Sequence, residues 1–169
     1  MNKKLIIRTI IFYLITVTLG TLSHFAFNFF NMDIHLKTIF PINESYFEHL
    51  KLFFYPFILT SIIEGIIYKE NLKYFIAKRG FIISFIMLFE IVYIILMTRI
   101  FGNNSFINIS SYYLLMLASY IISYKLKEEN KIILYGGYIN IFMWLIAFSI
   151  FSYYPLKSEV FKDPELLNS

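Results

Sequence analysis

The segment IILYGGYINIFMWLIAFSIFSYY, residues 132–154, contains no charged side chain. A helix of about 20 apolar residues is long enough to cross the hydrocarbon core of a bilayer. The segment is apolar on every face, and a helix satisfies its own backbone hydrogen bonds where water is absent. These residues therefore predict a transmembrane helix.

Four further segments have the same character. Hydrophobic residues make up 59% of the 169 positions and charged residues 15%, which is too few charges for a soluble surface. The apolar runs cover residues 5–23, 50–68, 80–97, 107–124 and 132–154. The sequence lacks the alternating ten-residue segments of a membrane β-barrel. We therefore expect an all-α, polytopic membrane helix bundle with five transmembrane helices, in which residues 1–169 form a single transmembrane domain.

The first apolar run has the position of a secretory signal peptide. However, Arg8 interrupts it, no clear small-x-small cleavage site follows, and apolar residues continue through Phe30. We therefore expect a retained first helix. The chain has no cysteine, which excludes disulfides, thiolate metal sites and cysteine nucleophiles.

The basic residues predict the orientation of the bundle, because loops rich in Lys and Arg stay in the cytoplasm. Ten lie in the N-terminal segment and around the second and fourth connections: Lys3, Lys4, Arg8, Lys69, Lys73, Lys78, Arg79, Lys125, Lys127 and Lys131. The other side has five: Lys37, Lys51, Arg99, Lys157 and Lys162. We expect the N-terminus inside and the C-terminus outside.

The net charge of +4 indicates contact with anionic lipid headgroups and no nucleic-acid partner, because the basic residues are concentrated in the predicted cytoplasmic loops. The expected partners are the lipid bilayer and either a homo-oligomer or other membrane proteins. The many Ile, Lys, Asn, Phe and Tyr residues indicate an AT-rich bacterial genome. We therefore expect the chain in a bacterial cytoplasmic membrane.

A dense polar stretch, NESYFEH at residues 43–49, precedes the second apolar run. One interpretation is a helix start, in which Ser45 and Glu48 form a capping box. The other is a site built with His24 from the end of the first run. Its candidate ligands for a divalent metal such as zinc or manganese are His24, Glu44, Glu48 and His49.

The same stretch also permits acid–base chemistry without a metal. Its candidate catalytic residues are Glu44, Glu48 and His49. The wider set of candidate binding residues is His24, Asn43, Glu44, Ser45, Glu48, His49, Lys51 and Asp163. If they form a site, their side chains converge on one outward-facing cavity, which a helix kinked at Pro56 helps to open.

Two acidic residues lie within the apolar runs. Glu64 is close to the cytoplasmic edge, where we expect it to extend towards Lys69 or Lys73. Glu90 lies near the middle of the third run, where an ionisable group is a functional hypothesis. Its expected partners are Asn140 and Ser119, either in a hydrogen bond between helices or in a proton or cation relay.

The nine-residue stretch NESYFEHLK, residues 43–51, resembles the N-E-S-x-W-E-H-L-K signature of a bacterial integral-membrane family, a domain of unknown function. His24-Phe25, Tyr154-Pro155 and the F-x-D-P element at residues 161–164 are similar to further parts of that family. Phe47 replaces the family's Trp, and Asn28 stands where an acidic residue is expected, which weakens a metal site that counts that carboxylate. The resemblance implies an architecture and a motif and no particular reaction.

The resemblance also brings Asp163 into consideration. From its composition, the tail of residues 157–169 is a frayed polar end. The alternative is a flap that brings Phe161 and Asp163 back over the mouth of the site.

Three functions follow from these observations. The first is a small binding or accessory membrane protein with an outward-facing polar site. The second is a membrane-embedded, metal-dependent hydrolase or transferase that acts on a lipid or envelope precursor. The third is a small transporter or proton or cation pathway that uses Glu90.

The orientation can be tested with alkaline phosphatase, which is active only outside the cytoplasm. A fusion after Ser169 should be active and a fusion after Lys73 inactive, because of the ten-to-five distribution of basic residues. The reverse pattern would contradict the predicted topology.

Overall fold

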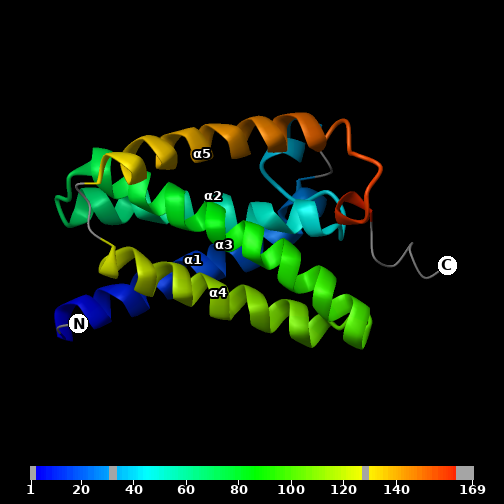
Figure 1. The fold of residues 1–169 in the computed structure, drawn as a ribbon, viewed down its shortest axis with the longest axis horizontal. Helices are drawn as coiled ribbons and strands as arrows, with labels where there is room; N and C mark the ends of the chain where they lie inside the picture. Colours follow the sequence, from blue (N-terminus) through cyan, green and yellow to red (C-terminus); the bar gives the residue numbers. More distant parts are fainter. Residues whose placement is uncertain (1–2, 31–33, 127–129, 163–169) are drawn as a thin grey trace.

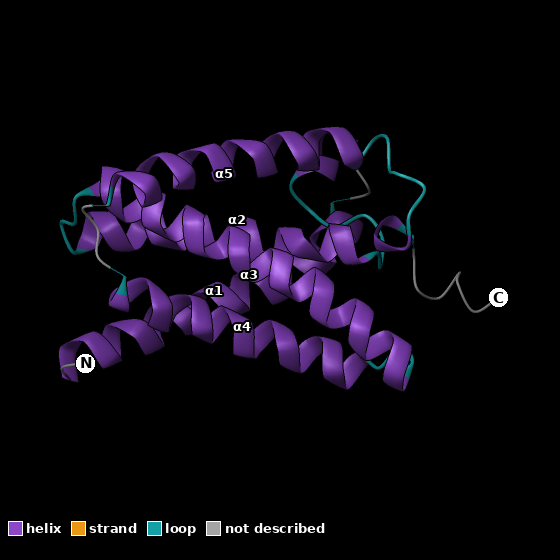
Figure 2. Ribbon diagram, viewed as in Figure 1, coloured by secondary structure: helices purple, strands orange, loops and turns teal. Residues whose placement is uncertain are grey.

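The computed structural model describes residues 3–30, 34–126 and 130–162. Five long helices follow one another: α1 (Lys3–Phe29), α2 (Tyr46–Ile67), α3 (Leu72–Phe101), α4 (Ser105–Lys125) and α5 (Lys131–Phe151). There are also two short 3₁₀ helices: η1 (Ile34–Thr38) precedes α2, and η2 (Glu159–Phe161) follows α5 (Figure 1). The described residues contain helices and loops and no strand (Figure 2). The all-α prediction is confirmed.

Each of the five long helices is long and apolar enough to cross a membrane, so the chain is a multi-pass membrane protein. Successive helices run in opposite directions, so that α1 begins at one end of the bundle and α5 ends at the other. We call the end where α1 finishes and α2 starts the cavity end. Most helix ends lie beyond the predicted runs, because polar residues continue the helices past the apolar part, as Lys73 and Arg79 do in α3. By contrast, α2 and α5 end before the predicted ends at residues 68 and 154.

The large exposed side chains are mostly apolar. Ile10 and Leu14 on α1 and Phe142 and Met143 on α5 are all exposed, although each would be buried in the core of a soluble protein. Helices that are apolar on every face are typical of a membrane environment. This exposed apolar surface is the one that we expect to face lipid.

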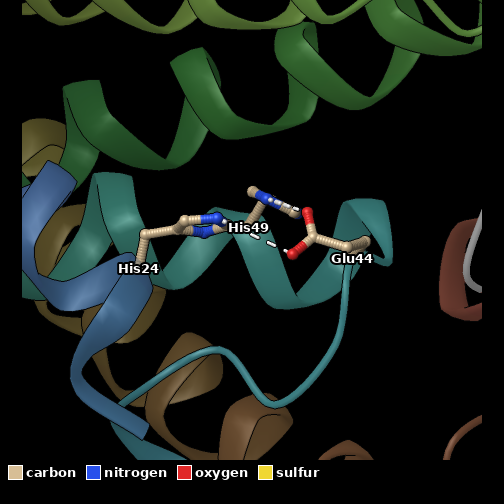
Figure 3. Close-up of side chains that lie close together, drawn as sticks. All are labelled: His24, Glu44 and His49. Atoms are coloured by element: carbon tan, nitrogen blue, oxygen red, sulfur yellow. Dashed lines mark ion pairs between the residues drawn. The ribbon is translucent and has the colours of Figure 1, made fainter. Parts of the chain in front are cut away.

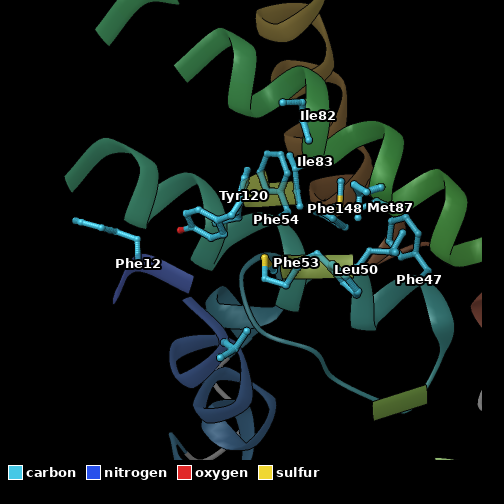
Figure 4. Packing of buried hydrophobic residues seen from close by; sticks show 14 residues of the cluster. Phe12, Phe47, Leu50, Phe53, Phe54, Ile82, Ile83, Met87, Tyr120 and Phe148 are labelled. Carbon is cyan, nitrogen blue, oxygen red and sulfur yellow. The ribbon is translucent and has the colours of Figure 1, made fainter. Parts of the chain in front are cut away.

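The core is built around α2, the most buried of the five long helices. Figure 4 shows its aromatic side chains, such as Phe54, packed between helices, with Met87 from α3, Tyr120 from α4 and Phe148 from α5. All four of these side chains are almost completely buried. The core therefore joins α2 to α3, α4 and α5.

The helix pair α3 and α5 packs closely because glycine lies at the contact. A Cβ added to Gly137 would collide with the backbone of Ala77, and one added to Gly80 would lie 3.0 Å from the carbonyl oxygen of Gly137. Small residues allow membrane helices to approach backbone to backbone. Gly137 therefore has a packing role.

Glu64 does not extend towards Lys69 or Lys73, and that expectation is wrong. Its side chain is fully buried between Arg8 of α1, whose Nε lies 2.5 Å from Oε1, and Arg79 of α3, whose Nη2 lies 2.8 Å from Oε2. Tyr124 of α4 also donates to Glu64. Direct pairing with two guanidinium groups replaces the hydration that a lone carboxylate would need. This network joins four helices at the end opposite the cavity end.

The close approach at Gly137 gives a stability prediction. Gly137→Ala should lower the free energy of unfolding by about 1–3 kcal/mol, because the added methyl group meets fixed backbone. Gly136→Ala is the matched control: its Cβ would lie 3.2 Å from the ring of Phe81, a side chain that can move. Thermal unfolding in detergent measures both. Equal effects of the two variants would contradict the backbone contact.

Candidate functional site

Three side chains of the polar stretch and of the first helix meet at the cavity end. His24 comes from α1, Glu44 from the loop before α2, and His49 from the first turn of α2 (Figure 3). Their ligand atoms all lie within 4.8 Å of one another. The structure thus brings together the residues that the sequence had placed at the ends of two different helices.

The carboxylate of Glu44 lies between the two imidazoles. Its Oε1 is 3.6 Å from His24 Nε2, and its Oε2 is 3.3 Å from His49 Nε2. The two rings are 5.2 Å apart between centroids. Ligands that surround zinc tetrahedrally at about 2.0–2.1 Å are themselves about 3.4 Å apart. The spacing of this His₂Glu cluster is therefore close to that of a metal centre.

The backbone of α2 orients His49. Its Nδ1 lies 3.0 Å from the carbonyl oxygen of Ser45, one turn earlier, and that oxygen can only accept a hydrogen bond. Nδ1 therefore donates a hydrogen to this oxygen, and Nε2 is directed towards Glu44. A metal-ligating histidine commonly donates its second ring N–H to a backbone carbonyl, which fixes the ring and its tautomer.

Glu44 is charged at neutral pH. The hydrogen bond from His49 and the attraction of the two imidazoles hold the pKa of its carboxyl below the usual range, although partial burial raises it. The side chain is 52% exposed, so a ligand can reach it. An ionised carboxylate beside two imidazoles is a donor set for zinc and similar ions.

The cluster forms part of the wall of a cavity of ≈ 420 Å³. Its walls come from α1, α2, α3 and α4, together with Asn103 in the turn between α3 and α4. A volume of about 300–1,000 Å³ is typical of small-molecule sites. From the end of α3 at Phe101, the cavity extends as far as Glu90, about 16 Å along the helix.

Glu90 is paired differently from the expectation. Its Oε1 accepts a hydrogen bond of 2.7 Å from the hydroxyl of Ser111, and its buried Oε2 has no hydrogen-bond partner in the part of the chain that the structure describes. The expected partners Asn140 and Ser119 are wrong, because Glu90 faces α4 and the cavity, whereas Asn140 is on α5. Ser119 lies about two turns beyond Ser111 on α4, and its hydroxyl donates to the carbonyl oxygen of Leu115.

Glu48 is separate from the His₂Glu cluster, although it was among the candidate metal ligands predicted from the sequence. It is 3% exposed and lies 2.5 Å from Nζ of Lys51, which is also buried. Its carboxylate also accepts hydrogen bonds from the amide of Ile42 and from the hydroxyl of Ser152. All of these partners are structural, so Glu48 is neither a metal ligand nor a free base here.

The capping box is only half formed. Ser45 is the N-cap of α2, and its hydroxyl accepts from the amide of Glu48 at 3.4 Å. The return bond from Glu48 is absent, because its side chain turns inwards to Lys51. Instead, Oδ1 of Asn43 accepts from the amide of Ser45 at 3.0 Å. Asn43 and Ser45 therefore shape the helix start and do not line the cavity.

Lys51 fixes the loop between α1 and α2. Besides Glu48, its ammonium group donates to the carbonyl oxygens of Lys37 at 2.5 Å and Phe40 at 3.3 Å. Tyr55, one turn later, donates to the carbonyl of Thr38. Lys51 is thus a structural residue, contrary to its place among the candidate binding residues.

The tail folds back as far as the structure describes it. Phe161 of η2 stacks on Phe47 with 4.6 Å between ring centroids and also contacts Phe151. The expectation of a frayed end is therefore wrong for the residues up to Lys162. Phe161 packs beside α2 and does not line the cavity, and Asp163 lies outside the described residues.

Sequence reasoning missed Ser111, which is the hydrogen-bond partner of Glu90, and Tyr112 of the cavity wall. The buried hydroxyl of Tyr112 has no hydrogen-bond partner among the described residues. The available signal was the spacing of Asn108 and Ser111, which places polar groups on one face of α4. A chain of small polar residues at such spacing is common on membrane helices, and nothing in it identifies Glu90 as the partner.

The chain matches no family model, no curated protein and no solved structure. The resemblance to the membrane family with the N-E-S-x-W-E-H-L-K signature therefore stays a prediction.

The buried pair of Glu48 and Lys51 gives a second stability prediction. Lys51→Met should cost about 3–5 kcal/mol of unfolding free energy, because it leaves a buried carboxylate without its counter-charge. The double variant Glu48→Gln/Lys51→Met should recover at least half of that loss, because no buried charge remains. Unfolding of the purified variants in mixed micelles measures the coupling. A loss below about 1 kcal/mol for Lys51→Met would contradict the role given to the pair.

Proposed function

We propose that this chain is an integral membrane protein that binds a divalent transition metal ion in an outward-opening cavity, with His24, Glu44 and His49 as ligands. The observation that carries the proposal is the convergence of three ligand atoms within 4.8 Å from two helices and the loop between them. The orientation of His49 by the Ser45 carbonyl supports it further. A ring already held for ligation loses little side-chain freedom when a metal binds.

Two imidazoles and one carboxylate are a ligand set known for zinc sites with one open position. Here the open position would face the cavity, because the cluster forms part of its wall. A structural zinc site has four protein ligands and no such opening. The proposed centre is therefore one that presents its metal to a small molecule.

The distribution of basic residues supports an outward-facing site. The cavity end is the end predicted to face away from the cytoplasm. The buried side chains of Phe57, Met116 and Tyr120 fill the bundle between the cavity and the network around Glu64. This packing supports binding at one face of the membrane over transport through it.

The experiment is calorimetric titration of zinc into detergent-purified protein that has been stripped of metal with a chelator. Wild type should bind one zinc ion per chain, and His24→Ala, Glu44→Gln and His49→Ala should each weaken binding by at least tenfold. His35→Ala is the matched control, because it removes the third histidine of the chain, which lies outside the cluster.

Circular dichroism and unfolding should show that the ligand variants keep the fold, since Glu44 is half exposed and both histidines are only partly buried. Absence of zinc binding to the wild type, or equal binding by all four variants, would overturn the proposed metal site.

A further inference from the structure

The cavity contains an acidic group whose hydrogen-bonding capacity is half used. Glu90 is 3% exposed, and Ser111 occupies only Oε1. Glu90 lines the same cavity as the His₂Glu cluster, and its buried Oε2 has no hydrogen-bond partner among the described residues. An ionisable group at this depth is costly, so an unused carboxylate oxygen needs a reason.

Glu90 and the proposed metal ligand His49 line the same main cavity. The two residues also line a second, narrow cavity of ≈ 20 Å³, together with Tyr46 and Ile94. A cavity needs about 10–15 Å³ to hold one water molecule. The second cavity is therefore large enough to hold one water molecule.

The charges on the walls of the main cavity favour a neutral substrate over an anionic one. No Lys or Arg is among its lining residues, within the part of the chain that the structure describes. An anionic phosphate ester would meet Glu44 and Glu90 with the metal as its single positive partner. A neutral carbonyl compound avoids this repulsion.

Part of the remaining wall is apolar. Leu52 and Phe53 of α2, Ile94 of α3 and Ile109 of α4 line the cavity beside the polar groups. This arrangement is suited to a molecule with a hydrophobic chain and a polar carbonyl group at one end. A single acyl chain attached through an ester has that form.

We propose that the chain hydrolyses a neutral acyl ester of a single-chain amphiphile, with Glu90 as the general base. This inference rests on the proposed metal site, which would lower the pKa of a bound water. Glu90 Oε2 takes a proton from that water, and the water oxygen forms a bond to the carbonyl carbon of the ester. The bond from that carbon to the alkoxy oxygen breaks, and Glu90 returns the proton to the leaving alkoxide. Ester and water become a carboxylic acid and an alcohol.

Tyr112 of α4 also lines the cavity. Its hydroxyl is buried beside α1 and has no hydrogen-bond partner among the described residues. The glycine at position 20 makes room for it, because a Cβ there would collide with the Tyr112 hydroxyl.

The test uses zinc-loaded full-length protein in detergent with p-nitrophenyl decanoate as the ester and bis(p-nitrophenyl) phosphate as the anionic comparator. Wild type should release nitrophenol from the ester in a zinc-dependent manner and much more slowly from the phosphate. Glu90→Gln should lower kcat by at least 100-fold, because general bases contribute about 10²–10⁴-fold. Its zinc affinity should stay within threefold of wild type.

Glu159→Gln is the matched control, because it removes an exposed carboxylate that pairs with Arg99 outside the cavity. If Glu90→Gln does not fold, Glu90→Asp replaces it, since the shorter acid should also lose most of the rate. Zinc binding without ester hydrolysis, full activity of the Glu90 variant, or faster hydrolysis of the phosphate would each overturn the proposed reaction and leave the metal site standing. Absence of zinc binding would overturn both.

Discussion

The buried ion pair between Glu48 and Lys51 is the interaction on which the cavity end depends. Lys51 joins the carboxylate of Glu48 to the backbone of the loop that returns from α1, through the carbonyls of Lys37 and Phe40. Glu48 in turn holds the amide of Ile42. Glu44 follows two residues later, so the pair determines where its carboxylate lies between the two imidazoles.

The fold was largely predictable because membrane solvation imposes one simple rule. Every apolar run long enough to cross a bilayer became a helix, since no other single segment satisfies its backbone there. Partner choice inside the bundle was not predictable in the same way. Glu64 binds Arg8 and Arg79, which are distant in sequence, rather than its neighbours Lys69 and Lys73, because packing brings α1 and α3 to its buried side chain.

The candidate site was predictable in its location and only partly in its membership. His24, Glu44 and His49 were expected at one end because α1 finishes and α2 begins there. Glu48 was counted with them because four-residue spacing puts two acids on one side of a helix. Spacing cannot tell that Glu44 precedes the helix and is exposed, whereas Glu48 lies inside it beside a buried lysine. The pairing of Glu90 with Ser111 depends on how α3 faces α4, which no local pattern contains.

The two ends of the bundle differ in how their charges are used. At the end opposite the cavity, both oxygens of Glu64 are bound by guanidinium groups, and aromatic rings surround Arg8 and Arg79. Such a carboxylate has no capacity left for a ligand, so its role is to join helices. At the cavity end, the carboxylate of Glu44 is half exposed between two imidazoles, and one oxygen of Glu90 has no donor among the residues that the structure describes. Burial alone does not separate structural from functional charges here, since Glu64 and Glu90 are both buried. The two residues differ in unused hydrogen-bonding capacity, and this difference is the reason why the proposed site lies at the cavity end.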